Sequence, residues 1–283
     1  AAYHPEGARL VSRVARQDQA TAMSYFGIGG SLGFVMGPAI GTAVLLTWGL
    51  RGTLLLIAPV LAMAAVLAPQ LSALSACEAA SRETKRAAAA GEARDAWGPF
   101  GRLSLIVIGR SIVFYALNTF VPLYWIHVLH QSKAKGGAAL SIMSAAGIVG
   151  SLLGGRLADR FGYRRVVLAG SCVSMPLLPA LLWADRPEIA LGLLILVGFV
   201  FSITYSPTVV MGQRYLPTRV GLASGVTLGL AVAVGGIASP LLGWIADHHG
   251  IRMALAGTIA VPVANAALAF TLPDPESAIR RRR

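Results

Sequence analysis

The chain has 283 residues, of which 55% are hydrophobic and only 13% charged, and its mean hydropathy is +0.67. A soluble domain of this size needs more polar surface, so the composition excludes a soluble globular fold and indicates an integral membrane protein. The formal net charge of +12 does not indicate nucleic-acid binding, because the basic residues occupy short loops between apolar segments and form no continuous face with interleaved aromatics.

Eight apolar segments, each long enough to cross about 30 Å of hydrocarbon as a helix, follow one another along the chain. They lie at residues 20–46, 52–76, 102–129, 137–156, 165–184, 188–213, 220–246 and 251–272. We therefore predict an all-α membrane protein. The polar, alanine-rich residues 77–101 form a solvated, partly helical connector between a first lobe, 1–76, and a second, 102–272, which a basic tail, 273–283, follows.

The basic residues predict the orientation, because Lys and Arg in short loops favour the cytoplasm. With the amino terminus of this chain inside, 18 of them fall on the inner side and 5 on the outer side, while Arg110 lies within a span. We expect both termini to be cytoplasmic and the protein to reside in the plasma membrane, which is the inner membrane of a bacterium with two. The run Arg280–Arg283 sets topology or, alternatively, contacts anionic lipid.

Metal and hydrolytic chemistry find little support in the sequence. Cys77 and Cys172 lie in different elements without metal-ligand spacing, so we interpret them as a loop thiol and a core residue. Asp247, His248 and His249 are adjacent, and two neighbouring His side chains cannot easily face one ion from a helix. No phosphate-binding loop and no Ser, His and Asp arrangement is present. We predict neither an enzyme nor a metal or organic cofactor, and an ion gradient as the energy source.

The loop Gly154–Arg165 (GGRLADRFGYRR) joins two spans tightly. Gly155 and Gly162 allow a sharp turn and a close approach of a neighbouring helix. Asp159 is the only acid among four arginines, and its carboxylate can pair with them and with the positive start of a helix. We expect Asp159 to stabilise one conformational state; alternatively, the loop only sets topology.

A weak internal repeat appears when the chain is compared with itself at an offset of 202 residues. The matching pairs are Tyr3 with Tyr205, Pro5 with Pro207, Gly27 with Gly229, Gly33 with Gly235, Pro38 with Pro240 and Gly41 with Gly243. Duplicated architecture explains such matches, and chance similarity among glycine-rich helices is the alternative. If the repeat is real, about a hundred residues precede this chain, which then holds the end of span four through span twelve.

Two motifs resemble those of the major facilitator superfamily. The loop motif is matched, with Tyr163 in place of a basic residue, by Gly155, Asp159, Arg160, Gly162, Arg164 and Arg165. The antiporter motif of the fifth helix is matched, with Thr42 in place of its last glycine, by Gly33, Gly37, Pro38 and Gly41. Residues 3–6 and 219–225 are similar to the fosmidomycin resistance family of drug exporters. The resemblance implies a helix bundle of twelve spans, a latch at the loop and a swivel in the fifth helix, although close packing explains the same glycines.

Polar residues within the spans are candidates for a substrate or proton path. They are His4, Glu6, Arg110, Asn118, Tyr205 and Gln213. His4 and Glu6 suit proton coupling or, equally, a helix cap. Arg110 shares a helix face with Phe114 and Asn118, and the alternative for it is snorkelling to the surface. Tyr205 with Pro207 is expected to unwind its helix locally, and Gln213 or Asn265 could instead join helices.

The prediction for function is a proton-coupled exporter of a small drug or metabolite that works by alternating access. A sugar or metabolite uniporter or symporter is the first alternative, and a truncated membrane fragment that does not transport is the second. The expected partners are the substrate and the lipid bilayer, without nucleic acid, and the full-length protein is expected to be a monomer.

Overall fold

A computed structural model describes residues 3–15, 18–70, 72 and 94–275, and within these the regular structure is entirely helical. The chain divides into two compact units, Ala1–Gly27 with Arg94–Arg283 and Ile28–Ala93. Seven helical stretches in the described residues are long and apolar enough to span a membrane. The chain is therefore an all-α integral membrane protein, as its composition predicts.

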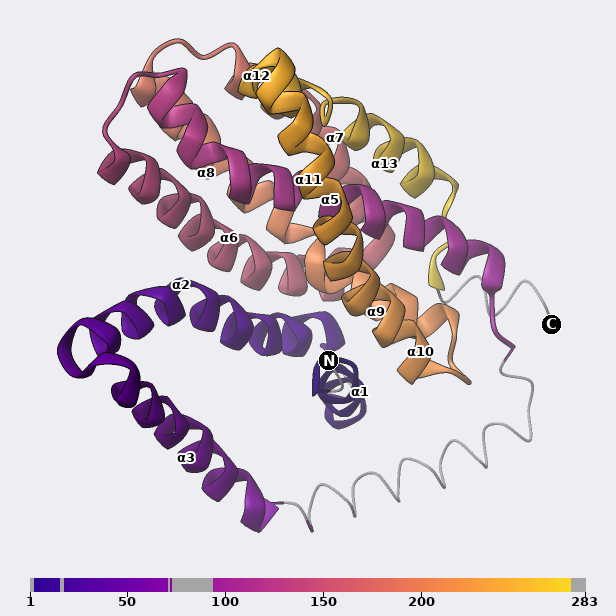
Figure 1. Cartoon of the computed structure of the whole chain (residues 1–283). Coiled ribbons are helices and arrows are strands. Elements are labelled where there is room, and N and C mark those ends of the chain that lie inside the picture. Colours follow the sequence, from indigo (N-terminus) through magenta and orange to yellow (C-terminus); the bar gives the residue numbers. More distant parts are fainter. Residues whose placement is uncertain (1–2, 16–17, 71, 73–93, 276–283) are drawn as a thin grey trace. The chain divides into compact units, whose positions relative to one another are not determined.

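The larger unit contains most of the helices (Figure 1). They are α1 (Tyr3–Val14), the start of α2 (Gln19–Gly52), α5 (Trp97–His127), α6 (Lys133–Phe161), α7 (Tyr163–Leu182), α8 (Pro187–Ile203), α9 (Tyr205–Tyr215), α10 (Val220–Ser224), the π-helix η3 (Gly225–Leu230), α11 (Ala231–His249), α12 (Ile251–Ala256) and α13 (Ala260–Thr271). Helix α6 packs along α8, α7 contacts α8 and α13, and α5 contacts α6, α11 and α13. These contacts build a bundle in which α5 is the central element.

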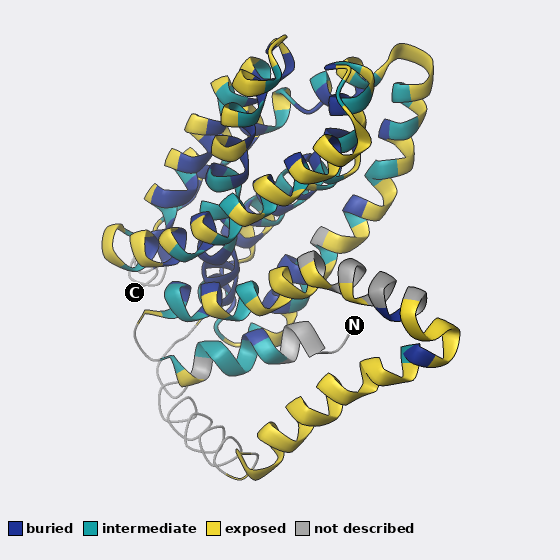
Figure 2. Ribbon diagram, turned by 90° about the vertical axis from the view of Figure 1, so that its left-hand side faces the viewer, coloured by how far each residue is buried: buried dark blue, intermediate teal, exposed yellow. Residues whose placement is uncertain are grey.

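The helices of the bundle carry buried residues on one side and exposed residues on the other (Figure 2). One core cluster includes Met23, Leu103 and Met211, and a second includes Tyr124 and Leu194. Large apolar side chains are nevertheless exposed on the outer faces, among them Phe270, Ile237 and Trp183. Exposed apolar faces around a polar-poor bundle are what a lipid environment favours.

Close contact between α6 and α8 depends on glycine. A Cβ at Gly150 would lie within the van der Waals radii of the Phe199 backbone, and a Cβ at Gly198 would meet the backbone of Met143. Small residues allow such close approach between membrane helices, where packing replaces the hydrophobic effect as the source of stability. The two helices are thus held at a distance that a methyl group would change.

We expect Gly150→Ala to lower the free energy of unfolding by about 1–3 kcal/mol, because backbone atoms of α8 cannot move aside as a flexible side chain can. Thermal unfolding of the purified protein in detergent measures the effect. Gly137→Ala on the same helix is the matched control, since nothing lies within 4 Å of a Cβ there. A variant at Gly150 as stable as that control would contradict the packing argument.

Several helices of the larger unit are interrupted. The chain leaves regular α-helix at Thr204, between α8 and α9, one residue before Tyr205. The interruption is confined to Thr204, whereas Tyr205 and Pro207, where unwinding was predicted, are helical in α9. A π-helical turn, a feature frequent at functional sites, separates α10 from α11. The last predicted span, 251–272, consists of α12 and α13 joined around Gly257.

The smaller unit begins within α2 and continues through η1 (Thr53–Leu56), α3 (Ile57–Leu67) and η2 (Ala68–Gln70). Helix α2 runs through Pro38 and departs from helical geometry at Gly49, where φ is 62° and ψ is −162°. A positive φ is readily adopted only by glycine. The observed kink in α2 therefore lies at Gly49, near the end of the helix.

Seven of the eight predicted spans correspond to the seven membrane-length stretches, and the eighth, 20–46, lies within α2. The helices α5 and α6 extend a few residues beyond the predicted bounds. The interpretation of Cys172 as a core residue is wrong, because its side chain is exposed on α7. Residues 77–93 of the connector, Cys77 and the tail 276–283 lie outside the described residues.

Candidate functional site

The Asp159 carboxylate, near the end of α6, caps the start of α2. Its Oδ1 accepts a hydrogen bond of 3.1 Å from the backbone N–H of Ala20. Its Oδ2 accepts bonds of 2.8 Å from both the backbone N–H and the hydroxyl of Thr21. The first N–H groups of a helix have no partner within the helix and carry partial positive charge. A carboxylate in this position satisfies two of them and stabilises the contact between α2 and α6.

Tyr163 extends this contact to α9. Its hydroxyl donates to Asp159 Oδ1 at 3.0 Å and accepts from Arg214 Nη2 at 2.9 Å. The Arg214 guanidinium also lies 4.5 Å from the centre of the Tyr163 ring, and its Nε donates to Gln19 Oε1 at 3.2 Å. The phenol hydroxyl thus bridges the Arg214 guanidinium and the Asp159 carboxylate. We call Asp159, Tyr163, Arg214 and the start of α2 the latch.

The loop arginines have other partners. Arg156 donates to the Tyr25 hydroxyl at 3.2 Å, and Arg164 Nη2 donates to the Phe270 carbonyl at 2.6 Å. The Arg160 side chain lies over the ring of Phe161, and Arg165 is exposed. Within the described residues, no arginine forms an ion pair with Asp159. Of the two partners considered for Asp159 in the sequence, the positive start of a helix is the one that the structure provides.

Two arginines, Arg164 and Arg102, bind carbonyl groups at the end of α13. Arg102 Nη1 donates to the Thr271 carbonyl at 2.7 Å, next to the Phe270 carbonyl that Arg164 binds. The last carbonyls of a helix lack intrahelical donors and carry partial negative charge, which cationic side chains complement. The loop motif therefore contributes an arginine to the C-terminal cap of α13.

We expect Tyr163→Phe to weaken the latch by about 0.5–1.5 kcal/mol, because it removes one donor to Asp159 and one acceptor for Arg214 but keeps the ring beneath the guanidinium. That loss corresponds to roughly a twofold to tenfold shift in the population of the closed latch. The distance between spin labels at Val14→Cys in α1 and Leu222→Cys in α10, both exposed positions, reports the shift, because α1 directly precedes α2 in the chain and contacts α10. An unchanged distance distribution would show that the phenol hydroxyl contributes nothing.

Helices α2, α6 and α9 also meet through a buried serine. The Ser24 hydroxyl lies 2.9 Å from the Ala20 carbonyl, 2.7 Å from the Ser151 carbonyl and 2.8 Å from the Ser206 hydroxyl. Gly155 faces the same contact, since a Cβ there would meet the Ala20 carbonyl oxygen at 2.5 Å. The first turns of α2 and the end of α6 therefore touch almost backbone to backbone.

For the antiporter-motif residues in α2, the structure does not decide between a swivel and close packing. A Cβ at Gly33 would meet nothing within 4 Å, and Gly33 is exposed. Gly37, Pro38 and Gly41 lie within α2, but their surroundings are outside the described part of the structure. The swivel and close-packing interpretations of these residues both stay predictions.

Two of the residues proposed for a substrate or proton path, Gln213 and Asn118, form hydrogen bonds with neighbouring groups of the bundle. Gln213 is buried and donates to the Ala8 carbonyl at 3.3 Å and to the Ser224 hydroxyl at 2.9 Å, so it joins α9 to α1 and α10. Asn118 donates to the Phe114 carbonyl of its own helix at 2.9 Å. His4 and Glu6 lie on α1, and their side chains are not among the described ones.

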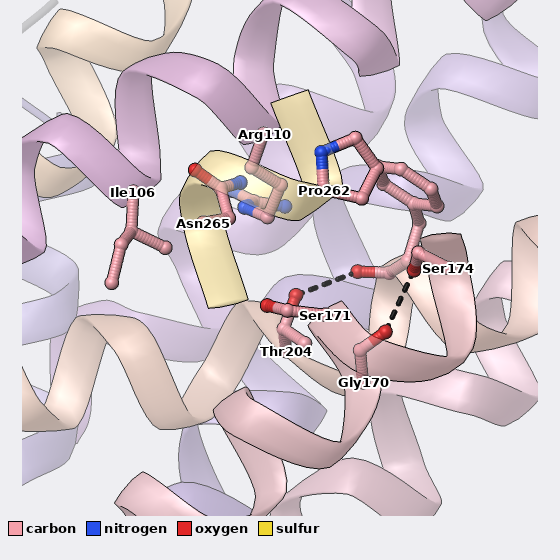
Figure 3. A pocket seen from close by; sticks show the side chains of 9 residues that line it. Ile106, Arg110, Gly170, Ser171, Ser174, Thr204, Pro262 and Asn265 are labelled. Carbon is pink, nitrogen blue, oxygen red and sulfur yellow. Dashed lines mark hydrogen bonds between the residues drawn. The ribbon is translucent and has the colours of Figure 1, made fainter. Parts of the chain in front are cut away.

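Arg110 and Tyr205 contact each other inside the bundle. The guanidinium carbon of Arg110 lies 5.0 Å from the centre of the Tyr205 ring, a cation–π geometry. Beside it lies a small cavity of about 20 Å³, lined by Ile106, Arg110, Gly170, Ser171, Ser174, Phe201, Thr204, Pro262 and Asn265 (Figure 3). The side chain of Arg110 therefore enters the interior of the bundle and does not extend to the membrane surface.

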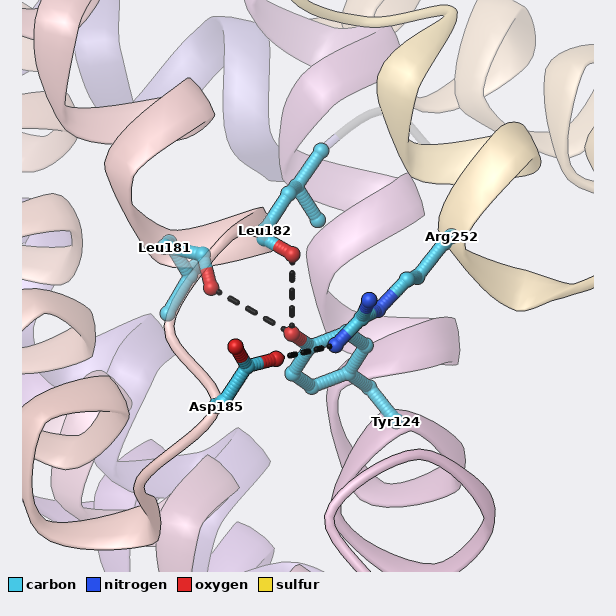
Figure 4. A network of polar contacts seen from close by, with 5 residues as sticks. All are labelled: Tyr124, Leu181, Leu182, Asp185 and Arg252. Atoms are coloured by element: carbon cyan, nitrogen blue, oxygen red, sulfur yellow. Dashed lines mark hydrogen bonds and ion pairs between the residues drawn. The ribbon is translucent and has the colours of Figure 1, made fainter.

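A second polar network lies at the C-terminal end of α7 (Figure 4). The Tyr124 hydroxyl donates to the Leu182 carbonyl at 3.1 Å, and Arg252 Nη2 lies 2.9 Å from Asp185 Oδ1. The arginine and aspartate are both well exposed, so their ion pair contributes little to stability. This network joins α5, the connection after α7 and α12 within the bundle.

No group of three His, Cys, Asp or Glu side chains suited to a metal ion occurs in the parts of the chain that the structure covers. His248 Nδ1 lies 2.8 Å from the Trp244 carbonyl, and its ring stacks on the indole. The sequence motifs did not reveal that Tyr163, Arg214 and Ser24 join the helices. The departure of Tyr163 from the basic residue of the loop motif was the signal for the first of them.

The larger unit is thus a bundle of membrane-length helices in which a charged loop caps a neighbouring helix. The family model described as Major Facilitator Superfamily matches residues 1–240. The chain belongs to the Major Facilitator Superfamily.

Curated relatives and solved structures agree with this assignment. The chain is 30% identical to the uncharacterized MFS-type transporter YfnC of Bacillus subtilis (strain 168), over 98% of this chain and 68% of that protein. It is 24% identical to the fosmidomycin resistance protein of Escherichia coli (strain K12), over 89% of this chain and 62% of that protein. The MFS transporter FucP in its outward conformation has the same fold, with a TM-score of 0.63 and 16% identity over 91% of this chain and 68% of that one.

Proposed function

We propose that the protein is a secondary active transporter that exports a small drug or metabolite from the cell by alternating access, with proton antiport as the energy source. Membership of the superfamily and the similarity to the fosmidomycin resistance protein support the transport of a small molecule and favour export. The resemblance of the motif in α2 to the antiporter motif, and the lack of a nucleotide-binding loop in this sequence, support the proposal of proton antiport.

The observation that carries the proposal is the capping of α2 by Asp159. Capping closes the bundle at one end, because it brings the start of α2 within hydrogen-bonding distance of the loop between α6 and α7. Opening that end requires three hydrogen bonds to the carboxylate to break together. A contact that is strong yet confined to one helix terminus is suited to a two-state element, whose equilibrium a substrate or a proton can shift.

The distribution of basic residues assigns the latch to the cytoplasmic face of the plasma membrane. With that orientation, the closed latch corresponds to an outward-facing state, from which a bound drug leaves the cell. Breaking the latch exposes the path to the cytoplasm, where the next substrate binds. Lipid surrounds the exposed apolar faces, and the functional unit in this proposal is a monomer.

Drug-resistance and efflux assays test the proposal. The complete reading frame that contains this chain is expressed in a fosmidomycin-sensitive bacterium, and growth and drug efflux are measured with and without a protonophore. Export predicts higher resistance that the protonophore abolishes. Resistance that persists with the protonophore would contradict proton coupling. Uptake of a sugar or metabolite that is independent of the pH gradient would instead support a uniporter.

A further inference from the structure

The cavity beside Arg110 contains a positive charge without a counter-charge. Arg110 lies near the middle of α5, about 20 Å along the helix axis from Trp97. Its Nε is buried without a hydrogen-bond partner, and no carboxylate in the described residues pairs with its guanidinium. A buried charge is costly unless it is paired and hydrogen-bonded, and an intramembrane arginine usually has a partner.

The contact with the Tyr205 ring does not replace the counter-charge and the hydrogen-bond acceptors that Arg110 needs. A cation over an aromatic face gains a modest electrostatic attraction through the ring quadrupole. The N–H groups, however, lie in the plane of the guanidinium and need acceptors of their own. The contact of 5.0 Å therefore holds one face of Arg110 and leaves its edge available to the cavity.

Asn265 of α13 provides a second unpartnered group in the same cavity. Its side chain is only 7% exposed, and within the described residues neither of its amide atoms has a hydrogen-bond partner. Figure 3 shows Arg110 and Asn265 pointing toward the same part of the cavity, from two different helices. Guanidinium and amide N–H groups that converge on one space form a donor set that an anion would satisfy.

The hydroxyls on the opposite wall can adapt to an anion. Ser171 and Ser174 of α7 donate to the carbonyls of Val167 and Gly170 at 2.8 and 2.7 Å. These carbonyls lie four residues earlier in the same helix, where they also accept from the backbone N–H. Rotating a hydroxyl proton into the cavity therefore leaves no carbonyl without a donor.

The size of the cavity restricts the occupant. About 20 Å³ is enough for one water-sized particle and too small for a drug. A water molecule could accept from Arg110 but would leave its charge uncompensated, whereas a monatomic anion both accepts the hydrogen bonds and neutralises the charge. We propose that the cavity between α5, α7 and α13 binds a halide-sized anion, chloride under physiological conditions, through Arg110 and Asn265. This site lies inside one bundle and is separate from the latch.

Thermal unfolding in different salts tests the site on the unmodified protein. The purified protein from the complete reading frame is compared in sodium chloride, sodium bromide and sodium gluconate at equal ionic strength. Because a ligand that binds the native state stabilises it, chloride and bromide should raise Tm by about 3 °C relative to gluconate, which is too large for the cavity. Equal Tm values in the three salts would show that water occupies the cavity and would overturn the proposal.

Two variants localise the effect. Asn265→Ala removes the amide donors and should reduce the halide-dependent rise in Tm at least by half, and Arg110→Gln should abolish it. Arg252→Gln, which changes an exposed arginine in the same way, is the matched control and should keep the full rise. If Arg110→Gln does not fold, the anomalous signal of bromide in crystals of the unmodified protein decides: a peak in the cavity supports the site, and its absence there refutes it.

Discussion

Asp159→Asn is expected to reduce transport at least tenfold while the protein still folds and inserts. The substitution removes the negative charge that faces the first N–H groups of α2, and places an amide donor where an acceptor is needed. Charge-assisted hydrogen bonds and the interaction with the helix terminus together contribute about 1.5–3 kcal/mol, which corresponds to a roughly tenfold to 150-fold change in the population of the closed state.

Two measurements separate a conformational effect from a loss of protein. The distance between spin labels at Val14→Cys and Leu222→Cys should lengthen in Asp159→Asn, since releasing the start of α2 from α6 also moves α1, which directly precedes α2 in the chain, away from α10. The amount of protein in the membrane should equal that of the unmodified protein.

Asp247→Asn is the matched control for this experiment. Asp247 is exposed near the end of α11, so the same chemical change should leave both transport and the label distance unaltered. Normal transport by Asp159→Asn would show that the loop serves topology alone, which is the alternative that the sequence left open.

The bounds of the membrane helices could be predicted from the sequence because burial in lipid imposes a simple requirement. Each span needs an uninterrupted apolar stretch of sufficient length, and the segments 165–184 and 251–272 match helical stretches within a few residues. The capping role of Asp159 was also accessible, because an isolated acid in a basic loop needs a partner and helix termini provide one.

The contact between Tyr163 and Arg214 within the latch could not be predicted from the sequence. Tyr163 and Arg214 lie 51 residues apart, and their contact depends on how α7 and α9 pack. The direction in which the Arg110 side chain points could not be predicted for a different reason. Helical periodicity places Arg110, Phe114 and Asn118 near one face, but the long arginine side chain turns into the bundle while Phe114 is exposed.

Gly155→Ala is expected to prevent the latch from closing, and so to reduce transport at least tenfold without destabilising the bundle. The added methyl group would meet the Ala20 carbonyl oxygen at 2.5 Å, and a backbone atom can yield only if the whole start of α2 moves. Asp159 lies one turn further along the same face of α6. Displacing α2 therefore lengthens the hydrogen bonds from Ala20 and Thr21 to the carboxylate beyond their effective range.

The neighbouring glycine provides a sharp comparison. A Cβ at Gly154 would collide with the backbone of Ile203 in α8, inside the bundle, whereas the one at Gly155 would collide with α2. Gly154→Ala should therefore lower Tm, by about 3–6 °C for a loss of 1–2 kcal/mol, and should leave the label distance between Val14→Cys and Leu222→Cys unchanged. Gly155→Ala should do the opposite, lengthening that distance at nearly constant Tm. If both variants lose stability equally, the contact between α2 and α6 is part of the static packing of the bundle and does not act as a switch.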